Sequence, residues 1–332
     1  MTAIAALPKL HSLGCELDSR PEAFGFITDS NDILDQPEAL RARLEEDGYL
    51  YIRNFFDPEL ILAGRRSIFR RIAAEGQLDP DHDLMDGVVH PDMLDAFKLD
   101  TAPTFKESDG KKRNPDKVAA FRPELAASSP EIQRVVFGPE ITGFYADLFG
   151  EPIRHFDYIW CRLMGPGHGT PTHCDWVYMG RGSQQLLTCW IPYVDIPLEV
   201  GGLILLEKSH KQKARIQAYL DKDVDSYCEN NPAQMQAVAK EGKWSFPGWL
   251  SKRPDSLPEK FQTRWLTAEN WNVGDFITFR MDLIHGSLDN QSDRVRFSTD
   301  TRYQPASHPA DERWIGVNPP GHSLAGKRGR IC

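Results

Sequence analysis

Three triplets in which an aspartate follows a histidine two positions later have the spacing of a two-ligand metal site. On an extended strand, residues i and i+2 point to the same side, so the imidazole and the carboxylate can reach one ion. A second, distant histidine would complete the two-imidazole, one-carboxylate set that holds Fe(II) and leaves positions open. Each triplet alone is more often an ordinary polar pair. The triplets are His90-Pro91-Asp92, His155-Phe156-Asp157 and His173-Cys174-Asp175.

The surroundings of the triplets favour the third. The first has proline at its centre, which is poorly suited to a paired strand, and the second opens a strand without a preceding turn. The third follows the glycine-rich turn 165–171 and precedes another apolar stretch. Downstream, the segment 273–287 contains His285, and Arg296 follows eleven residues later. With this downstream context, a metal site at 173–175 becomes a better interpretation than an ordinary polar pair.

The elements that must position these residues change in kind along the chain. A helix is predicted from Pro37 to about Glu46, because proline suits the first helical turn and Gly48 the left-handed position after the end. A second helix begins at the Asp57 cap, and a third helical region spans roughly 130–148. Short strands without intervening helices then follow, which predicts an α+β fold built on an antiparallel sandwich or barrel. The strand candidates are 154–164, 186–194, 202–206, 273–279 and 295–303.

The chain is predicted to form one domain, 1–332, in four parts. Residues 211–270 interrupt the strand-rich part with helical and proline-rich sequence. A loop this long inside a compact domain usually has a function, so we predict a lid that carries Trp244 and Trp249, with an oligomer contact as an equal alternative. The four parts are an N-terminal arm at 1–36, a mainly helical support at 37–150, a strand-rich core at 151–304 and a C-terminal tail at 305–332.

Charge and composition disfavour several classes of protein. The 332 residues include 48 acidic and 39 basic side chains, a formal net charge of −9, whereas binding to a phosphate backbone favours the opposite sign. No apolar run approaches the roughly 18–20 residues of a membrane span, and the N-terminus has no secretory pattern. The six cysteines have no paired spacing, which predicts reduced thiols. We therefore expect a cytoplasmic protein that binds neither nucleic acid nor membrane.

An ordered set of motifs runs from about 154 to 304. It consists of HCD at 173–175, WIPYVD at 190–195, GGLILL at 201–206, Ser209-His210, VGD at 273–275 and HGS at 285–287, followed by Asn290, Ser292 and Arg296. Together with Asp47-Gly48-Tyr49, this set resembles the phytanoyl-CoA dioxygenase family of Fe(II)- and 2-oxoglutarate-dependent oxygenases. The sequence has Glu207-Lys208 where the family usually has Pro-Gly, and we expect only a local change of turn there.

The resemblance implies a fold and a metal site. The fold is a double-stranded β-helix (jelly roll) at 151–304 with the N-terminal helices packed against one sheet. The metal is Fe(II), and the resemblance assigns it to His173, Asp175 and His285.

The resemblance also implies a 2-oxoglutarate site. It places Arg296 on the distal carboxylate of this co-substrate, with help from Ser287, and Trp190 along its side. A guanidinium presents a rigid fork to a carboxylate, so arginine suits the role better than lysine. Arg294 shares the strand face, but the family spacing favours Arg296. Thr188 shares the face of Trp190, where it either bonds the co-substrate or belongs to the core.

The activity implied by the resemblance is O2-dependent hydroxylation of a small-molecule metabolite, with conversion of 2-oxoglutarate to succinate and CO2. Asp175 favours hydroxylation over halogenation, because relatives that halogenate usually have a small residue there. Two alternatives stay open. One is desaturation, epimerisation or ring closure at the same iron, and the other is a non-catalytic metal-binding jelly roll that acts as a sensor or a sugar-binding protein.

Substrate contacts are expected next to the metal triplet and on strand faces shared with the ligands. Several of these candidates are arginines, which would suit an anionic substrate but could instead pair with buried acids such as Asp300. The candidates are Trp176, Tyr178, Arg162, Tyr158 and Arg302.

Overall fold

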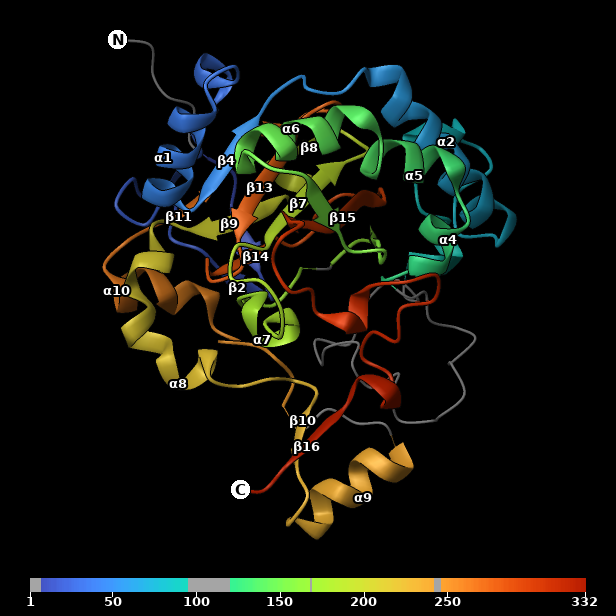
Figure 1. The fold of residues 1–332 in the computed structure, drawn as a ribbon. Helices are drawn as coiled ribbons and strands as arrows, with labels where there is room; N and C mark the ends of the chain where they lie inside the picture. Colours follow the sequence, from blue (N-terminus) through green and yellow to red (C-terminus); the bar gives the residue numbers. More distant parts are fainter. Residues whose placement is uncertain (1–6, 95–119, 168, 242–245) are drawn as a thin grey trace.

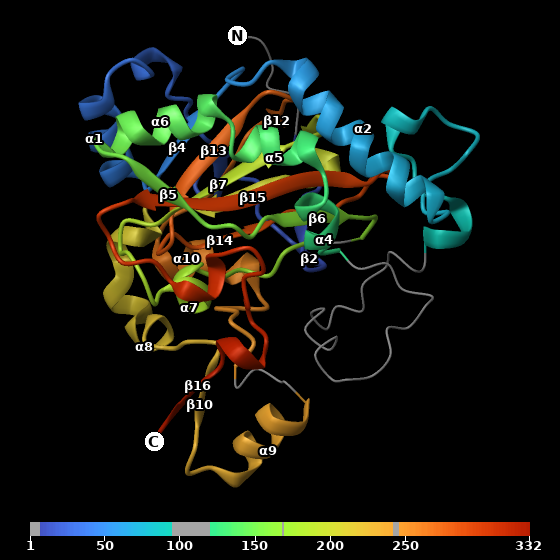
Figure 2. The ribbon, with the colours of Figure 1, turned by 45° about the vertical axis from the view of Figure 1, so that its right-hand side comes forward.

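Two β-sheets and a layer of helices form the body of the protein. The computed structural model describes residues 7–94, 120–167, 169–241 and 246–332. In both ribbon views the larger sheet lies above the smaller one, and helices cover the outer face of the larger sheet (Figures 1 and 2). This is the predicted α+β jelly roll, with helices on one sheet.

The larger sheet has six strands, and all its pairings are antiparallel. The long strand β15 is central, because it pairs with β7 on one side and with both β5 and β6 on the other. The predicted strand 154–164 is thus divided into two. The strands are β4 (Tyr49–Ile52), β13 (Phe276–Arg280), β7 (Leu187–Pro192), β15 (Arg296–Pro305), β5 (Ile153–His155) and β6 (Trp160–Met164).

The smaller sheet has four strands in the order β14, β9, β11, β3. Its strand β9 alternates as a strand between two layers should, since Leu203 and Leu205 enter the core shared with the larger sheet while Ile204 and Leu206 enter a second cluster. The strands are β14 (His285–Ser287), β9 (Leu203–Leu206), β11 (Trp265–Thr267) and β3 (Phe24–Phe26). Three short pairs complete the strands: β1 (His11–Ser12) with β2 (Cys15–Glu16), β8 (Ile196–Pro197) with β12 (Asn270–Trp271), and β10 (Ser226–Cys228) with β16 (Arg328–Arg330).

The helices that cover the larger sheet begin and end where their capping residues require. The Asp57 carboxylate accepts the backbone N–H of Glu59 at the start of α2, and Gly48 ends α1 with a φ of 82°, which glycine adopts without strain. The predicted helical region 130–148 is interrupted before Pro139, so it forms two helices. The covering helices are α1 (Pro37–Asp47), α2 (Pro58–Ala74), α4 (Pro123–Ala127), α5 (Pro130–Val136) and α6 (Pro139–Phe149).

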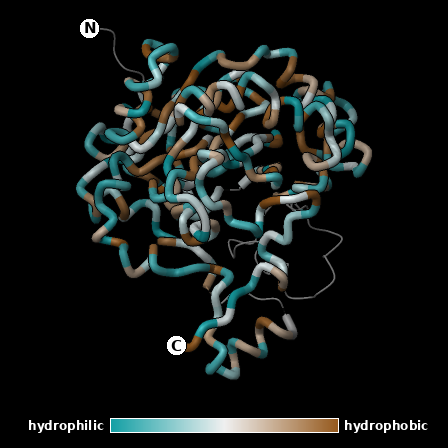
Figure 3. The backbone as a smooth tube through the Cα atoms, viewed as in Figure 1, coloured by the Kyte–Doolittle hydropathy of each residue, from teal (hydrophilic) through white to brown (hydrophobic). Residues whose placement is uncertain are grey.

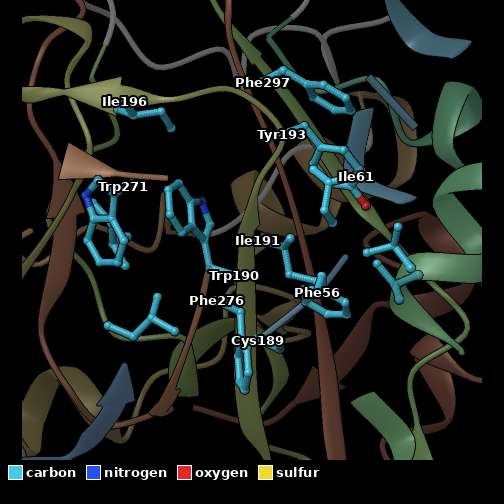
Figure 4. Packing of buried hydrophobic residues seen from close by; sticks show 14 of the residues in the cluster. Phe56, Ile61, Cys189, Trp190, Ile191, Tyr193, Ile196, Trp271, Phe276 and Phe297 are labelled. Atoms are coloured by element: carbon cyan, nitrogen blue, oxygen red, sulfur yellow. The ribbon is translucent and has the colours of Figure 1, made fainter. Parts of the chain in front are cut away.

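The core lies between this helical layer and the sheets. Hydrophobic stretches follow the central strands in Figure 3, and Figure 4 shows the aromatic packing at close range. The rings of Tyr193 and Phe297 stack with centroids 4.5 Å apart, and Trp190 meets Trp271 edge to face at 5.1 Å. This packing fixes β7 and β15, which carry much of the site described below.

Two segments are more structured than predicted. The N-terminal arm supplies β3, which pairs in parallel with β11, and β11 lies inside the range 211–270 although it is a strand of the smaller sheet. The interruption therefore ends before Trp265. It contains α8 (Gln217–Leu220), α9 (Pro232–Glu241) and α10 (Leu257–Phe261). Trp244, predicted to lie in a lid, falls outside the described residues.

The prediction that all cysteines are reduced is wrong, because Cys228 and Cys332 form a disulfide. The parallel pairing of β10 with β16 brings their Cα atoms to 5.5 Å, and a sequence separation of 104 residues hid this proximity. The other cysteines are free thiols. Among the described residues, no helix has the length and apolarity needed to cross a membrane.

Candidate metal centre

The three predicted metal ligands meet at one point between the sheets. His173 and His285 exchange two backbone hydrogen bonds of 2.9 Å, which align the two ligands side by side. Asp175 immediately precedes α7 (Trp176–Met179), so its carboxylate arrives from a helix start rather than from a continued strand. The ligand atoms of the three residues lie within 4.8 Å of one another. Asp175 Oδ1 is 3.4 Å from His173 Nε2 and 3.6 Å from His285 Nε2.

Backbone carbonyls set the orientation of both imidazoles. His173 Nδ1 lies 2.7 Å from the carbonyl oxygen of Pro171, and His285 Nδ1 lies 3.0 Å from that of Leu283. An N–H on each Nδ1 satisfies these acceptors and leaves the Nε2 lone pair to face Asp175. Burial, reinforced by the neighbouring His173, lowers the pKa of His285 to about 3, so this ring is neutral, as a metal ligand must be.

Two hydrogen bonds fix the outer oxygen of the Asp175 carboxylate. Oδ2 accepts the hydroxyl of Thr188 at 2.5 Å and Nη2 of Arg302 at 2.7 Å. Burial alone would raise the pKa of Asp175, but Arg302 and the two histidines outweigh it and hold that pKa well below its usual range. The other oxygen, Oδ1, therefore belongs to an ionised carboxylate and faces the two Nε2 atoms, where it can act as a metal ligand.

Beside the three ligands is a narrow pocket with a buried cation in its wall. Arg296 is 2% exposed. Its Nη1 donates to the carbonyl of Gly201, but its Nε has no hydrogen-bond partner within the described chain. Burial, with repulsion from Arg162, lowers the pKa of Arg296. A buried guanidinium that makes no direct ion pair within the described chain fits the carboxylate of a bound anion.

The other predicted co-substrate residues also line this pocket. Trp190, Thr188 and Ser287 all contribute to its wall, and the Ser287 hydroxyl accepts the backbone N–H of Thr170 at 2.7 Å. Thr188 contacts the metal ligand Asp175, which the sequence did not indicate. The donor set of two imidazoles and a carboxylate, together with the unpaired Arg296, therefore fits Fe(II) and 2-oxoglutarate.

The predicted substrate residues fall into different environments. Arg162 lines the pocket and pairs with Asp300, its Nη2 lying 3.0 Å from Oδ2. Arg302 donates to Asp300 at 2.6 Å as well as to Asp175, so it links two carboxylates. Tyr178 presents its ring edge to His173, with centroids 5.5 Å apart, and its hydroxyl donates to the carbonyl of Pro247.

Two of the predicted substrate residues lie beyond the pocket wall. Tyr158 packs against Trp160, with centroids 4.6 Å apart, and against Trp314 at 5.2 Å. Trp176 lines a separate cavity of about 260 Å³ beside α1 and α6.

Sequence reasoning missed Phe279 in the pocket wall and the aromatic residue Trp314 behind it. Phe279 lines the pocket with its ring 4.7 Å from that of His285, and it stands opposite Thr188 in the sheet, so strand register would have found it. Trp314 comes from the C-terminal tail, which has no recognisable motif. Only the tertiary structure shows that it lies beside Trp160.

Comparison with known proteins agrees with this geometry. The family model described as phytanoyl-CoA dioxygenase matches residues 44–298. The chain is 25% identical over 290 residues to a 1-deoxypentalenic acid 11-beta-hydroxylase of Streptomyces exfoliatus, covering 84% of this chain and 85% of the relative. A protein of the same name from Streptomyces arenae is 25% identical over 300 residues, covering 86% and 87%.

Two solved structures share the fold. EctD from S. alaskensis, in complex with 2-oxoglutarate and 5-hydroxyectoine, has a TM-score of 0.54 and 15% identity, covering 99% of this chain and 97% of that one. The non-heme alpha-ketoglutarate-dependent carbocyclase SnoK from nogalamycin biosynthesis has a TM-score of 0.51 and 18% identity, covering 86% and 89%. Since the family model spans most of the sequence and the ligand set converges as the family requires, the chain belongs to the phytanoyl-CoA dioxygenase family of Fe(II)- and 2-oxoglutarate-dependent oxygenases.

Proposed function

We propose that this oxygenase holds Fe(II) with His173, Asp175 and His285 and hydroxylates a C–H bond of a small-molecule metabolite. The reaction consumes substrate, 2-oxoglutarate and O2, and yields the alcohol, succinate and CO2. The observation that supports it most is the convergence of two Nε2 atoms and one carboxylate oxygen beside the unpaired Arg296.

The residues of the chain orient and enclose the reactants. Bound Fe(II) supplies the activation of O2 and the oxidising power. Arg302 and Thr188 hold Asp175 so that Oδ1 faces the metal position, which is the supporting role that partners of metal ligands usually have. We assign the distal carboxylate of 2-oxoglutarate to Arg296 and Ser287, with Trp190 along its side.

Hydroxylation is favoured over the alternative outcomes. Asp175 occupies a ligand position that halogenation would need for chloride, and the curated relatives that cover most of this chain are named as hydroxylases. A non-catalytic metal-binding protein would have no use for a buried guanidinium beside the metal position. Desaturation, epimerisation and ring closure use the same ligands, so product analysis distinguishes them.

The first experiment detects the iron site directly. Addition of Fe(II) and 2-oxoglutarate without oxygen should produce a weak visible charge-transfer band. The band should be lost in His173→Ala and retained in the control Arg294→Gln, whose side chain is exposed. Absence of the band in the wild type, or its persistence in His173→Ala, would contradict the assignment. A metabolite screen that measures succinate release, followed by mass spectrometry for one added oxygen, then tests hydroxylation.

We also propose that the segment 247–251 acts as part of a lid. The backbone N–H of Leu250 donates to the carbonyl of Thr172 at 2.8 Å, and the Thr172 hydroxyl donates to the carbonyl of Ser251. The Tyr178 hydroxyl reaches Pro247. These bonds support a wall over the strand that leads to His173. Substitution of Thr172 by valine should raise succinate formation in the absence of substrate, and an unchanged uncoupled rate would argue against a lid.

A further inference from the structure

The pocket around the metal position contains more positive than negative charge. Arg162, Arg296 and Arg302 line it, and the described carboxylates within ion-pair distance of them are Asp175 and Asp300. Asp289 acts on Arg296 only from farther away. Three guanidinium groups against two ion-paired carboxylates leave one positive charge, since histidine binds a metal as the neutral imidazole. A ferrous ion and a dianionic 2-oxoglutarate cancel each other, so the loaded pocket keeps this surplus. Burial makes an uncompensated charge unfavourable, which favours a ligand with one negative charge.

Arg162 has hydrogen-bonding capacity left for such a ligand at a terminal nitrogen. Arg296 is assigned to 2-oxoglutarate. Both terminal nitrogens of Arg302 are held, by Asp300 and Asp175, and only its inner Nε has no partner in the described chain. Arg162 directs Nε and Nη2 to Asp300, but its Nη1 donates to no described atom. The carboxylate it uses is shared with Arg302. One carboxylate between two guanidinium groups leaves Arg162 only partly neutralised.

Arg162 lies at the wall of the pocket that contains the metal position. Its side chain lines the same pocket as His173, His285 and Arg296. Its guanidinium therefore lies at the wall shared by the metal position and the co-substrate anchor. An anion bound by Arg162 would therefore hold its own carbon skeleton beside the metal.

A group of aromatic rings lies beyond the pocket wall, next to Arg162 on β6. Trp160 shares a strand face with Arg162 by the two-residue period, and its ring lies beneath the Arg302 guanidinium at 3.9 Å. Trp160 packs against Tyr158 and Trp314 with centroids 4.6 and 4.8 Å apart. On its other side the Arg162 guanidinium lies 4.8 Å from the Phe121 ring. The anion-binding end is thus flanked by aromatic surface, which suits an apolar body.

We propose that Arg162 is a specificity-determining residue that binds the carboxylate of a hydrophobic monocarboxylic acid substrate through Nη1, and that the apolar body extends past the pocket wall onto the half-buried rings of Tyr158 and Trp160. This inference rests on the proposed function. The same guanidinium chemistry could serve the 1-carboxylate of 2-oxoglutarate, and the experiment distinguishes the two sources.

The test measures binding rather than turnover. The wild-type protein, loaded with Fe(II) and saturating 2-oxoglutarate without oxygen, is titrated calorimetrically with adamantane-1-carboxylate, 2-naphthoate and decanoate, each beside its primary amide. At least one carboxylate should bind about tenfold or more tightly than its amide, since a charge-assisted bond is lost in the amide. Arg162→Gln should abolish this preference, Arg162→Lys should keep part of it, and the exposed-site control Arg294→Gln should keep all of it.

The outcomes separate the inference from the proposed function. If the wild-type protein forms no charge-transfer band with Fe(II) and 2-oxoglutarate, the iron site itself is refuted. If the band forms but no carboxylate of the set is preferred over its amide, or the preference survives in Arg162→Gln, the substrate role of Arg162 is refuted. A half-saturating 2-oxoglutarate concentration that rises about tenfold or more in Arg162→Gln would assign the residue to the co-substrate instead and overturn the proposal. An intact band in Arg162→Gln shows that the variant is folded at the metal position.

Discussion

Asp175 at the metal centre and Asp225 beneath the C-terminal tail are both buried aspartates among cations, but their oxygens are used differently. Both oxygens of Asp225 are bonded: Oδ2 accepts Arg313 and His322, and Oδ1 accepts Lys327 at 2.5 Å. In Asp175 only Oδ2 is bonded within the chain, and Oδ1 faces two imidazole lone pairs. A saturated carboxylate holds segments of chain together, whereas one with a free oxygen among lone pairs can bind an ion.

The arginines of the two clusters differ in the same way. Arg313 donates to Asp225, to Asp311 and to the carbonyl of Tyr178, so its whole fork is occupied. Arg296 reaches one carbonyl and has an unpaired Nε. Unfilled hydrogen-bonding capacity, rather than burial or charge, therefore separates a ligand site from a structural cluster.

The largest expected effect comes from removing the Asp175 carboxylate, whose Oδ1 has no hydrogen bond within the described chain. Asp175→Ala should weaken Fe(II) binding by more than about a hundredfold, since loss of a mere supporting partner already costs about 10–100-fold. Anaerobic Fe(II) titration measures it. Iron affinity within about threefold of wild type would contradict the role of Asp175 as a ligand.

Removing the Asp225 carboxylate, both oxygens of which are hydrogen-bonded, should lower the stability of the protein rather than its metal affinity. Asp225→Ala removes the buried carboxylate that Arg313, His322 and Lys327 share, which should lower the free energy of unfolding by about 3–5 kcal/mol. Denaturant unfolding measures this loss, and the Fe(II) titration serves as the control, because the metal affinity should stay unchanged. A variant with wild-type stability but weakened iron binding would abolish the distinction between the clusters.

The unpaired arginine should control the co-substrate alone. Arg296→Leu should raise the 2-oxoglutarate concentration at half-saturation of the charge-transfer band by about a hundredfold, as expected when one partner of a buried charged pair is truncated. Fe(II) affinity measured without 2-oxoglutarate should not change. Parallel losses of both affinities would indicate a general collapse of the pocket.

The smallest effect is a pH dependence confined to the tail cluster. Burial would raise the pKa of Asp225, but His322 and Lys327 outweigh it and lower the pKa to about 2 from an unperturbed 3.8. The unfolded chain therefore binds the proton first as the pH falls. The stabilisation from Asp225, about 2 kcal/mol, is complete above about pH 5 and is lost as the pH falls toward about 2. Unfolding curves of wild type and Asp225→Asn should converge over this range, and parallel curves would exclude the effect.

Local sequence patterns predicted the parts of the molecule that depend on interactions between residues close together in the sequence. The helix start at Pro37, its glycine end at Gly48 and the strand around Thr188 follow from capping and two-residue alternation. The ligand triplet and the arginine eleven residues after His285 were also recognisable. Lys208, which stands where the family usually has glycine, has a left-handed φ of 53°.

Contacts between residues far apart in the sequence could not be predicted. Asp225 meets Arg313 and Lys327 only after the tail has crossed the molecule, and no local period encodes that contact. The disulfide was missed for the same reason. Alternation placed Arg302 on the face of Arg296, but it did not show that its guanidinium contacts Asp175 rather than open space.

The reciprocal backbone bonds between His173 and His285 have a consequence for the life of the enzyme. Because these main-chain bonds set the spacing of the two strand positions without an ion, we expect the two rings to stay side by side when the metal is removed. Stripping by a chelator should therefore be reversible, and fresh ferrous salt should restore the centre without any refolding step.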